Sequence, residues 1–340
     1  LEELQAFARK RDGIEALESW DKAYYSEKLK QEKFQLDDEA LKPYFELGRV
    51  LDGVFEIAGR LFGLRFEEDA SLETYHEEVR GFRVLDSETG RLKAHFFADF
   101  HPRPGKRNGA WMTSFKPQFR RAGSNERPQI SIVCNFTRPT ESTPALLTFT
   151  EVTTLFHEFG HALHGMLADT TYPGLSGTSV FWDFVELPSQ IMENWCFQPE
   201  ALSLFARHYK TGEILPEDWV ERLRKSANFQ EGMATVRQLS FGFLDMSWHA
   251  HDPGDIKDVK AHESEAFRPT RLFPEQAETC MSTSFAHIFQ GGYASGYYSY
   301  KWAEVLDADA FSFFEETGIF NPETAARFKE HILSRGGTED

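Results

Sequence analysis

The sequence is an acidic chain of 340 residues, long enough for one large enzyme core or about two domains. Asp plus Glu number 54 against 37 Lys plus Arg, and the formal net charge of −17 repels the phosphates that nucleic-acid and anionic-membrane binders must attract. The apolar fraction of 41% is that of a folded protein, and no apolar run approaches the roughly 18 residues of a membrane span. We therefore expect a globular protein whose partners include neither nucleic acid nor membrane.

The chain shows helical periodicity at both ends. In residues 1–70 apolar positions recur at intervals of three and four, as in Leu47, Val50 and Val54, with charges between them. From Thr148 onward the same pattern returns. No linker rich in Ser, Gly and Pro marks a domain boundary, and no internal repeat occurs. The pattern predicts a mainly α protein.

Between these helical parts the periodicity changes to that of strands. Val79–Leu85 and Leu92–Phe100 flank Asp86–Gly90, whose small polar residues and glycine are typical of a hairpin loop. Ile130–Phe136 is a third expected strand. The Gly-, Pro- and Arg-rich residues 101–127 are expected to form a long loop. The sequence therefore predicts one small sheet.

The three cysteines, Cys134, Cys196 and Cys280, lie far apart and form no C-x-x-C motif, so they indicate neither a disulfide framework nor a thiolate zinc site. This usage fits a reducing compartment, and we expect a cytoplasmic protein. The chain opens at Leu1 with neither a signal-peptide nor a transit-peptide pattern. It is interpreted as a piece of a longer protein.

One motif carries metal chemistry. Thr148 and Glu151 form a capping box that predicts a helix start. On that helix His157 and His161 are one turn apart, so both imidazoles can meet a single divalent ion. Glu158 lies beside them, where it can hydrogen-bond water instead of the metal. This His-Glu-x-x-His pattern is typical of zinc peptidases.

Spacing alone does not identify the third metal ligand. The glycine and histidine that a metzincin needs are replaced by His164 and Leu167, so that subclass fails. A carboxylate from a second helix remains, and Glu186, Glu193 and Glu200 are candidates. The first two are seven residues apart and would share a helix face. His164 is interpreted as a packed histidine more readily than as a ligand.

Three segments resemble those of a known family: Phe156–His164, Trp182–Gln190 and Met192–Trp195. They are similar to the thimet oligopeptidase and neurolysin family of zinc metallopeptidases, most of all to its bacterial oligopeptidase A and dipeptidyl carboxypeptidase branch. The resemblance extends over most of the chain, from Trp20–Asp21 to Ser334–Gly337. The motifs are long enough to be highly specific.

The resemblance implies a ligand set and a fold. In the family the glutamate of the second segment is the third zinc ligand, which selects Glu186 over Glu193 and implies one Zn²⁺ per chain. Residues 1–340 would form a single zincin-like helical metallopeptidase catalytic region with a small β-sheet. Family members are much longer, so the chain is expected to lack an N-terminal helical half, a candidate partner, and the extreme C-terminus.

A Gly-rich segment near the C-terminus follows His287. Its members are Gly291, Gly292, Tyr293, Tyr297 and Tyr300, and helical spacing would put the three tyrosines on one face, away from Tyr298. Spacing alone favours an aromatic packing stripe. The resemblance implies instead that His287, Tyr297 and Tyr300 act in catalysis. It also implies that Tyr293 and the two glycines contact substrate in a loop that opens and closes.

We therefore expect a zinc-dependent oligopeptidase that hydrolyses internal bonds of short peptides. Zinc would lower the pKa of a bound water and polarise the scissile carbonyl, Glu158 would move the proton to the leaving amine, and His287 with Tyr297 or Tyr300 would stabilise the oxyanion. Alternatives are a dipeptidyl carboxypeptidase and a non-catalytic metal- and peptide-binding fragment. The basic loop 101–107 could also meet a peptide carboxylate, although a solvated loop is the commoner explanation.

Overall fold

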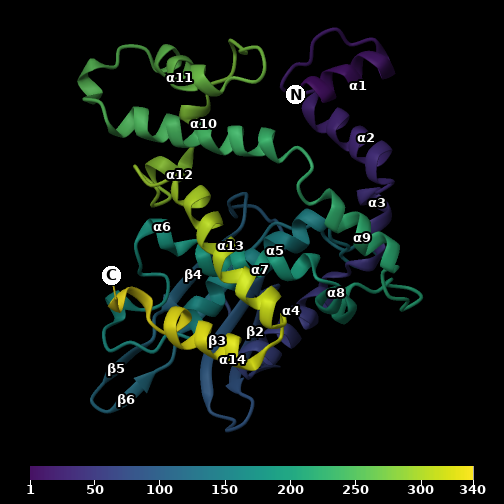
Figure 1. Cartoon of the computed structure of the whole chain (residues 1–340). Helices are drawn as coiled ribbons and strands as arrows, with labels where there is room; N and C mark the ends of the chain where they lie inside the picture. Colours follow the sequence, from purple (N-terminus) through teal and green to yellow (C-terminus); the bar gives the residue numbers. More distant parts are fainter. Residues whose placement is uncertain (340) are drawn as a thin grey trace. The chain divides into compact units, whose positions relative to one another are not determined.

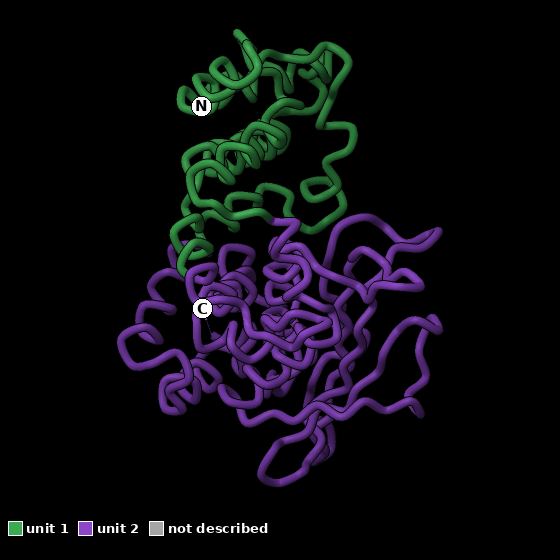
Figure 2. Tube along the Cα trace, turned by 90° about the vertical axis from the view of Figure 1, so that its right-hand side faces the viewer, with its two compact units in different colours: residues 1–37, 221–302 green, residues 38–220, 303–340 purple. Residues whose placement is uncertain are grey.

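The computed structural model describes residues 1–339 (Figure 1) and contains two compact units (Figure 2). Unit 1 comprises residues 1–37 and 221–302, and unit 2 comprises residues 38–220 and the segment from 303 onward. Two of the crossings between units fall inside helices, so no linker could mark them in the sequence. The prediction of one catalytic region over 1–340 concerns function and stays a prediction.

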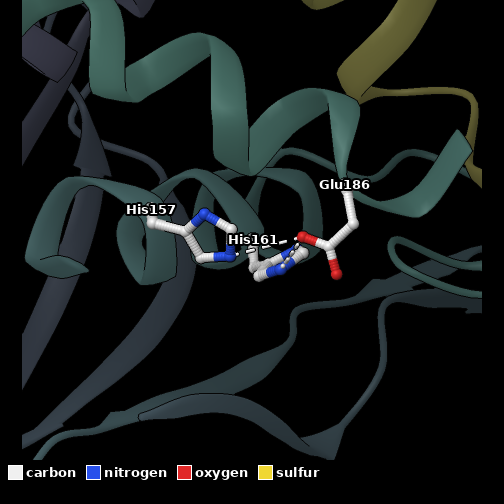
Figure 3. A group of neighbouring side chains, drawn as sticks. All are labelled: His157, His161 and Glu186. Atoms are coloured by element: carbon white, nitrogen blue, oxygen red, sulfur yellow. Dashed lines mark ion pairs between the residues drawn. The ribbon is translucent and has the colours of Figure 1, made fainter. Parts of the chain in front are cut away.

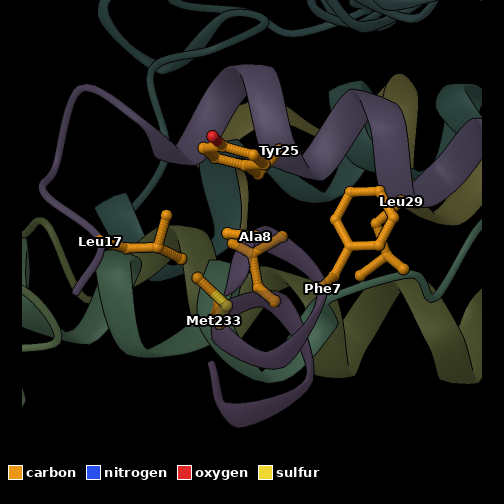
Figure 4. Packing of buried hydrophobic residues seen from close by; sticks show 7 residues of the cluster. Phe7, Ala8, Leu17, Tyr25, Leu29 and Met233 are labelled. Atoms are coloured by element: carbon orange, nitrogen blue, oxygen red, sulfur yellow. The ribbon is translucent and has the colours of Figure 1, made fainter. Parts of the chain in front are cut away.

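Unit 1 consists mainly of helices. They are α1 (Glu2–Asp12), α2 (Lys22–Phe34), α10 (Glu231–His249), α11 (Val259–Phe267) and α12 (Ala286–Phe289), with part of α9 (Glu217–Ser226) and the start of α13 (Ser299–Thr317). One apolar cluster joins the first two helices to α10 (Figure 4). Its members are Leu4, Phe7, Ala8, Leu17, Tyr25, Leu29 and Met233. Segments far apart in the sequence therefore share one core in this unit.

Unit 2 combines helices with a sheet. Its helices are α3 (Asp38–Leu41), α4 (Leu47–Phe62), α5 (Phe149–Met166), α6 (Trp182–Val185), α7 (Leu187–Glu193), α8 (Pro199–Phe205) and α14 (Pro322–Phe328). Its strands are β1 (Leu64–Glu68), β2 (Arg80–Asp86), β3 (Leu92–Asp99), β4 (Trp111–Lys116), β5 (Phe119–Arg121), β6 (Ser124–Glu126) and β7 (Gln129–Val133). Five strands form a sheet in the order β1-β2-β3-β7-β4, and β5 pairs with β6.

One face of the sheet packs against α4 and α5. Phe96 of β3 meets Phe159 of α5 with ring centroids 5.7 Å apart, and Phe55 of α4 stacks on Phe66 of β1 at 4.1 Å. Because side chains alternate along a strand, the neighbours of Phe96 point to the other face. The apolar stripe of α4 is buried as the periodicity predicts. This layer positions α5.

The structure confirms a mainly α fold with a small sheet and the three expected strands, each within three residues of its predicted ends. Two expectations are wrong. Residues 64–68 form β1, although the segment 1–70 was expected to be helical, because a five-residue edge strand next to α4 gives little periodicity to detect. Residues 111–126, expected as loop, hold β4, β5 and β6. Among the described residues, no helix is long and apolar enough to cross a membrane.

Candidate metal centre

Helix α5 begins where the sequence predicts. The Thr148 side chain accepts from the backbone N–H of Glu151 over 3.1 Å, and Glu151 Oε2 accepts from the backbone N–H of Thr148 over 2.8 Å. This reciprocal capping box fixes the first turn of the helix. The histidines that follow therefore have a defined position along the helix.

Two histidines of α5 converge on one carboxylate (Figure 3). His157 Nε2 lies 3.3 Å and His161 Nε2 lies 3.2 Å from Glu186 Oε2. These three residues form a group whose ligand atoms all lie within 4.8 Å of one another. The ligand set that the resemblance implied is thus brought together by the fold.

Glu186 comes from the junction between α6 and α7, immediately before the first residue of α7. Pro188 occupies the first turn of α7, where its missing N–H and fixed φ are tolerated. Gly160 of α5 lets this turn approach, because a Cβ there would lie 2.1 Å from the Pro188 carbonyl oxygen and 2.6 Å from Ser189 Cα. The backbone contact between α5 and α7 therefore sets the position of Glu186.

Two polar contacts hold the candidate ligands Glu186 and His157 in place. The Ser189 hydroxyl donates to Glu186 Oε2 over 2.8 Å, and the Nδ1 nitrogen of His157 donates to Glu193 Oε1 over 2.7 Å. A proton on Nδ1 leaves the Nε2 lone pair free to bind a metal, so Glu193 orients the histidine instead of replacing Glu186. Glu200, the third carboxylate considered, lies on α8 and is not in the group of convergent ligand atoms.

The chemistry of this group fits a divalent cation. Burial would raise the pKa of Glu186, but the charges and hydrogen bonds of His161 and His157 lower it well below its usual range. Burial raises the pKa of Glu158, whose Oε2 has no hydrogen-bond partner among the described residues. Two imidazole nitrogens and one ionised carboxylate oxygen are a donor set that suits a divalent cation such as zinc, and the Glu158 carboxyl beside them is left uncommitted.

His164 is packed in the interior and is not part of the ligand group. Burial, together with repulsion from His161, lowers the pKa of His164 to about 3, so its ring stays neutral. Neither ring nitrogen has a hydrogen-bond partner among the described residues. The interpretation as a packed histidine is confirmed.

The Gly-rich segment lies in unit 1 and is anchored by a buried carboxylate of α10. Asp245 Oδ1 accepts from the backbone N–H of Ser295, and Asp245 Oδ2 accepts from that of Tyr297, both over 2.9 Å. His249 Nδ1 lies 2.8 Å from the same carboxylate. Pattern reasoning missed Asp245, because its partners are backbone groups some fifty residues away.

The backbone explains why Gly291 and Gly292 are glycines. A Cβ at Gly291 would lie 2.7 Å from His287 Cα, and Gly292 has φ near +90°, a region that favours glycine. α13 starts only at Ser299, so the condition of a shared helical face does not hold for Tyr293 and Tyr297, which lie in a loop as the resemblance implied. The segment is an irregular loop that leads into α13.

The aromatic rings of this loop nevertheless gather. Tyr300 stacks on Tyr293 at 5.1 Å and tilts against Tyr297 at 5.0 Å, and the His287 ring lies 6.0 to 6.5 Å from all three. Tyr297 is buried in an apolar cluster, and its hydroxyl donates to Gln238 over 3.1 Å. Tyr298 is half exposed. The packing interpretation holds for Tyr297, whereas the catalytic roles stay predictions.

A comparison with known proteins decides the family. The family model described as "Peptidase family M3" matches residues 1–340. The chain belongs to peptidase family M3. Curated relatives match all or nearly all of the chain. Oligopeptidase A of Escherichia coli (strain K12) is 45% identical over 343 residues, which cover 100% of this chain and 50% of that protein.

Two further relatives carry names other than that of the Escherichia coli oligopeptidase A. Dipeptidyl carboxypeptidase of Escherichia coli (strain K12) is 41% identical over 343 residues, which cover 100% of this chain and 50% of that protein. The probable cytosolic oligopeptidase A of Arabidopsis thaliana is 41% identical over 351 residues, which cover 99% of this chain and 50% of that protein. This M3 chain thus spans about half the length of the curated relatives it matches.

Proposed function

We propose that the chain is the catalytic part of a zinc-dependent oligopeptidase that hydrolyses internal bonds of short peptides. One observation carries this proposal: the Nε2 atoms of His157 and His161 and Oε2 of Glu186 converge beside the buried carboxyl of Glu158. Membership of peptidase family M3 supports a peptidase. A zincin-like arrangement of α5, α7 and the sheet belongs to the same proposal.

The division of labour follows from the contacts. His157, His161 and Glu186 would hold one zinc ion, which supplies Lewis-acid activation of water and of the scissile carbonyl when it is bound. Glu158 accepts a proton from the attacking water at Oε2 and then donates it to the leaving amine. Burial raises its pKa, and a carboxylate with a raised pKa is a stronger base. Glu193 keeps the proton of His157 on Nδ1.

The residues of the Gly-rich loop complete the proposal. We assign His287, Tyr297 and Tyr300 as donors that stabilise the developing oxyanion, and Tyr293 with Gly291 and Gly292 as substrate contacts. The clustered rings and their anchoring to Asp245 support a preorganised loop. Opening of the loop would require these contacts to change.

The first experiment measures metal content and turnover together. We expect one zinc per chain and chelator-sensitive cleavage of an internally quenched peptide. Glu158→Gln should retain zinc and lose about 10²- to 10⁴-fold in turnover, because general base catalysis is removed while every ligand remains. Glu200→Gln is the matched control and should change neither quantity. Near-normal turnover by Glu158→Gln would show that the base is wrongly assigned.

Two alternatives keep support from the comparisons. A dipeptidyl carboxypeptidase is favoured by the relative of that name, and a non-catalytic metal- and peptide-binding fragment by the half-length match. Digestion of one peptide with a free C-terminus and one with an amidated C-terminus tests the first alternative. Cleavage of both peptides at internal bonds excludes an enzyme that only removes C-terminal dipeptides. Bound peptide without cleavage after zinc addition would favour the fragment.

Partners and location follow the same proposal. Short peptides are the proposed substrates, and the half of the relatives that this chain does not match is a proposed partner in trans. We propose the cytoplasm as the location. The relatives include both a probable cytosolic oligopeptidase A and an organellar one, so fractionation of the source cells is the direct test.

A further inference from the structure

A tight turn in the basic loop brings two cations to one carboxylate. In Arg103-Pro104-Gly105-Lys106 the Lys106 N–H donates to the Arg103 carbonyl oxygen over 3.1 Å, and Gly105 has φ near +83°. Proline followed by a glycine with positive φ is the signature of a type II turn. Both side chains therefore return to the end of β3, where Asp99 is buried.

Asp99 is saturated by these contacts. Arg103 donates to its two oxygens over 2.7 and 2.8 Å, Lys106 donates to Oδ1 over 2.9 Å, and the Tyr75 hydroxyl donates to Oδ2 over 3.0 Å. Burial would raise the pKa of Asp99, but these hydrogen bonds together lower it. Asp99 is therefore ionised at neutral pH and carries a single negative charge.

The charges around Asp99 do not balance. The side chains of Lys106 and Asp99 are only 3% and 1% exposed, and Arg103 is 17% exposed. A cavity of about 440 Å³ adjoins them, and its charged lining residues are Asp99, Arg103, Lys106 and Arg107, so three cations face one anion. In a chain whose net charge is −17, this is a local excess of positive charge, made up of the sheltered Arg103 and Lys106 and the exposed Arg107.

Two of the cations can still donate. Both terminal nitrogens of Arg103 bond Asp99, and its Nε has no hydrogen-bond partner in the described part of the chain. Arg107 forms no ion pair with any residue from 1 to 339 and lies over the Trp111 ring at 5.5 Å. The cavity thus offers donors for an anion.

The other walls are aromatic. Tyr75 and Phe115 are 49% and 53% exposed, and their ring centroids lie 5.7 Å apart. Trp111 and Thr113 of β4 share their side of the strand with Phe115. Exposed aromatic rings beside unneutralised cations match a ligand that has an acid group and an aromatic group.

The cavity lies on the face of the sheet away from α5. Asp99 pairs with Val133 and Phe96 with Ile130, and it is the Phe96 side that contacts α5. Asp99, three residues further on, points the opposite way. The sheet therefore separates this cavity from the ligands His157 and His161.

We propose that this cavity binds a small organic carboxylate that bears an aromatic group. The carboxylate bonds Arg103 and Arg107, and the aromatic group lies among Tyr75, Trp111 and Phe115. A free peptide C-terminus and a free aromatic acid share this chemistry. The proposal does not depend on the peptidase activity.

The test is calorimetric titration of the metal-loaded chain. N-acetyl-phenylalanine represents a peptide C-terminus, 3-phenylpropionate represents a free aromatic acid, and N-acetyl-phenylalanine amide lacks the charge. We expect saturable binding of at least one acid and none of the amide at millimolar concentrations. Whichever acid binds more tightly identifies the source of the ligand.

Variants locate the binding. Arg103→Gln should weaken it about tenfold or more, because a charge-assisted bond is lost. Arg107→Gln should weaken it by a smaller factor and leaves the Asp99 contacts intact. Arg120→Gln, which removes an exposed charge paired with Asp169, is the matched control and should have no effect. The proposal would be overturned if the amide or inorganic phosphate bound as tightly as the acids. It would also be overturned if Arg103→Gln and Arg107→Gln both bound the acid as tightly as the unmutated chain.

Discussion

The candidate metal centre in unit 2 and the aromatic loop in unit 1 are built by different means. Backbone packing positions the ligands, since Gly160 lets α5 touch the first turn of α7 and the capping box fixes where α5 begins. In the aromatic loop one buried carboxylate, Asp245, holds irregular backbone through two N–H groups. The first arrangement depends on helix contact, and the second depends on a single charge. Each can therefore be disrupted without the other.

The largest effect is expected at Gly160. Gly160→Ala forces a Cβ against the Pro188 carbonyl, so α7 must shift and carry Glu186 away from the histidines. Overpacking of this kind costs about 1–3 kcal/mol or more, and zinc affinity should fall with it. Chemical denaturation and metal titration measure the two effects.

Gly242→Ala in α10 is the control, because nothing lies within 4 Å of its would-be Cβ. It should be neutral or stabilising by about 0.5–1 kcal/mol, since alanine suits a helix interior better than glycine. Unchanged zinc binding in Gly160→Ala would contradict the view that backbone contact places Glu186.

Asp245→Ala should lower turnover without lowering zinc content, in contrast to Gly160→Ala. Its loss leaves the N–H groups of Ser295 and Tyr297 without their acceptor, at a cost of about 1–3 kcal/mol. Turnover of the quenched peptide should drop, whereas zinc content should stay at the unmutated level. Asp252→Ala, which removes a local cap in the same unit, is the matched control. A drop in zinc content would show that the two regions are not separable.

Asp307 of α13 gives a pH test within unit 2. Burial raises its pKa to about 7, opposed by a 2.6 Å hydrogen bond from Asn194, and Glu193 adds repulsion. A carboxyl with a folded-state pKa above its unfolded value binds more protons when folded, so this group's contribution to stability falls as pH rises from about 4 to 7. Asp307→Asn should flatten that decline in denaturation curves. An unchanged pH dependence would contradict the assignment.

The smallest effect is expected at Thr148. Thr148→Ala removes the acceptor for the Glu151 N–H and should cost about 1 kcal/mol. Turnover should change little, because α5 is also held by the sheet and α7. Thermal unfolding measures the loss, and Thr148→Ser should restore most of it. A large loss of zinc would show that the cap itself sets the ligand geometry.

These differences explain what could be predicted from the sequence. The convergence of His157 with His161 follows from helix spacing, and the capping box marks the start of their helix, because both signals are local. The choice of Glu186 over Glu193 needed the family resemblance, since a spacing of seven does not distinguish a ligand from the residue that orients a ligand. The structure shows the latter contact for Glu193.

Non-local features escaped prediction. The partnership of Asp245 with the Gly-rich loop joins residues some fifty positions apart, and no pattern encodes it. Helical spacing says nothing about Tyr293 and Tyr297, because these residues precede α13 and their rings gather through loop geometry. The short strands β4 to β6 lie in a Gly- and Pro-rich stretch, where the turn at Ala122 and Gly123 uses two positive φ angles.

The register of β3 determines which of its side chains face the core under α5 and which face the charged cavity. Ala98 and Asp99 are neighbours in the chain, yet one belongs to the core under α5 and the other to the charged cavity. Deleting one residue between Leu92 and Phe97 would exchange them, sending an acid into the hydrocarbon interior and a methyl group toward the arginines. Length changes in this strand should therefore be tolerated only in pairs of residues.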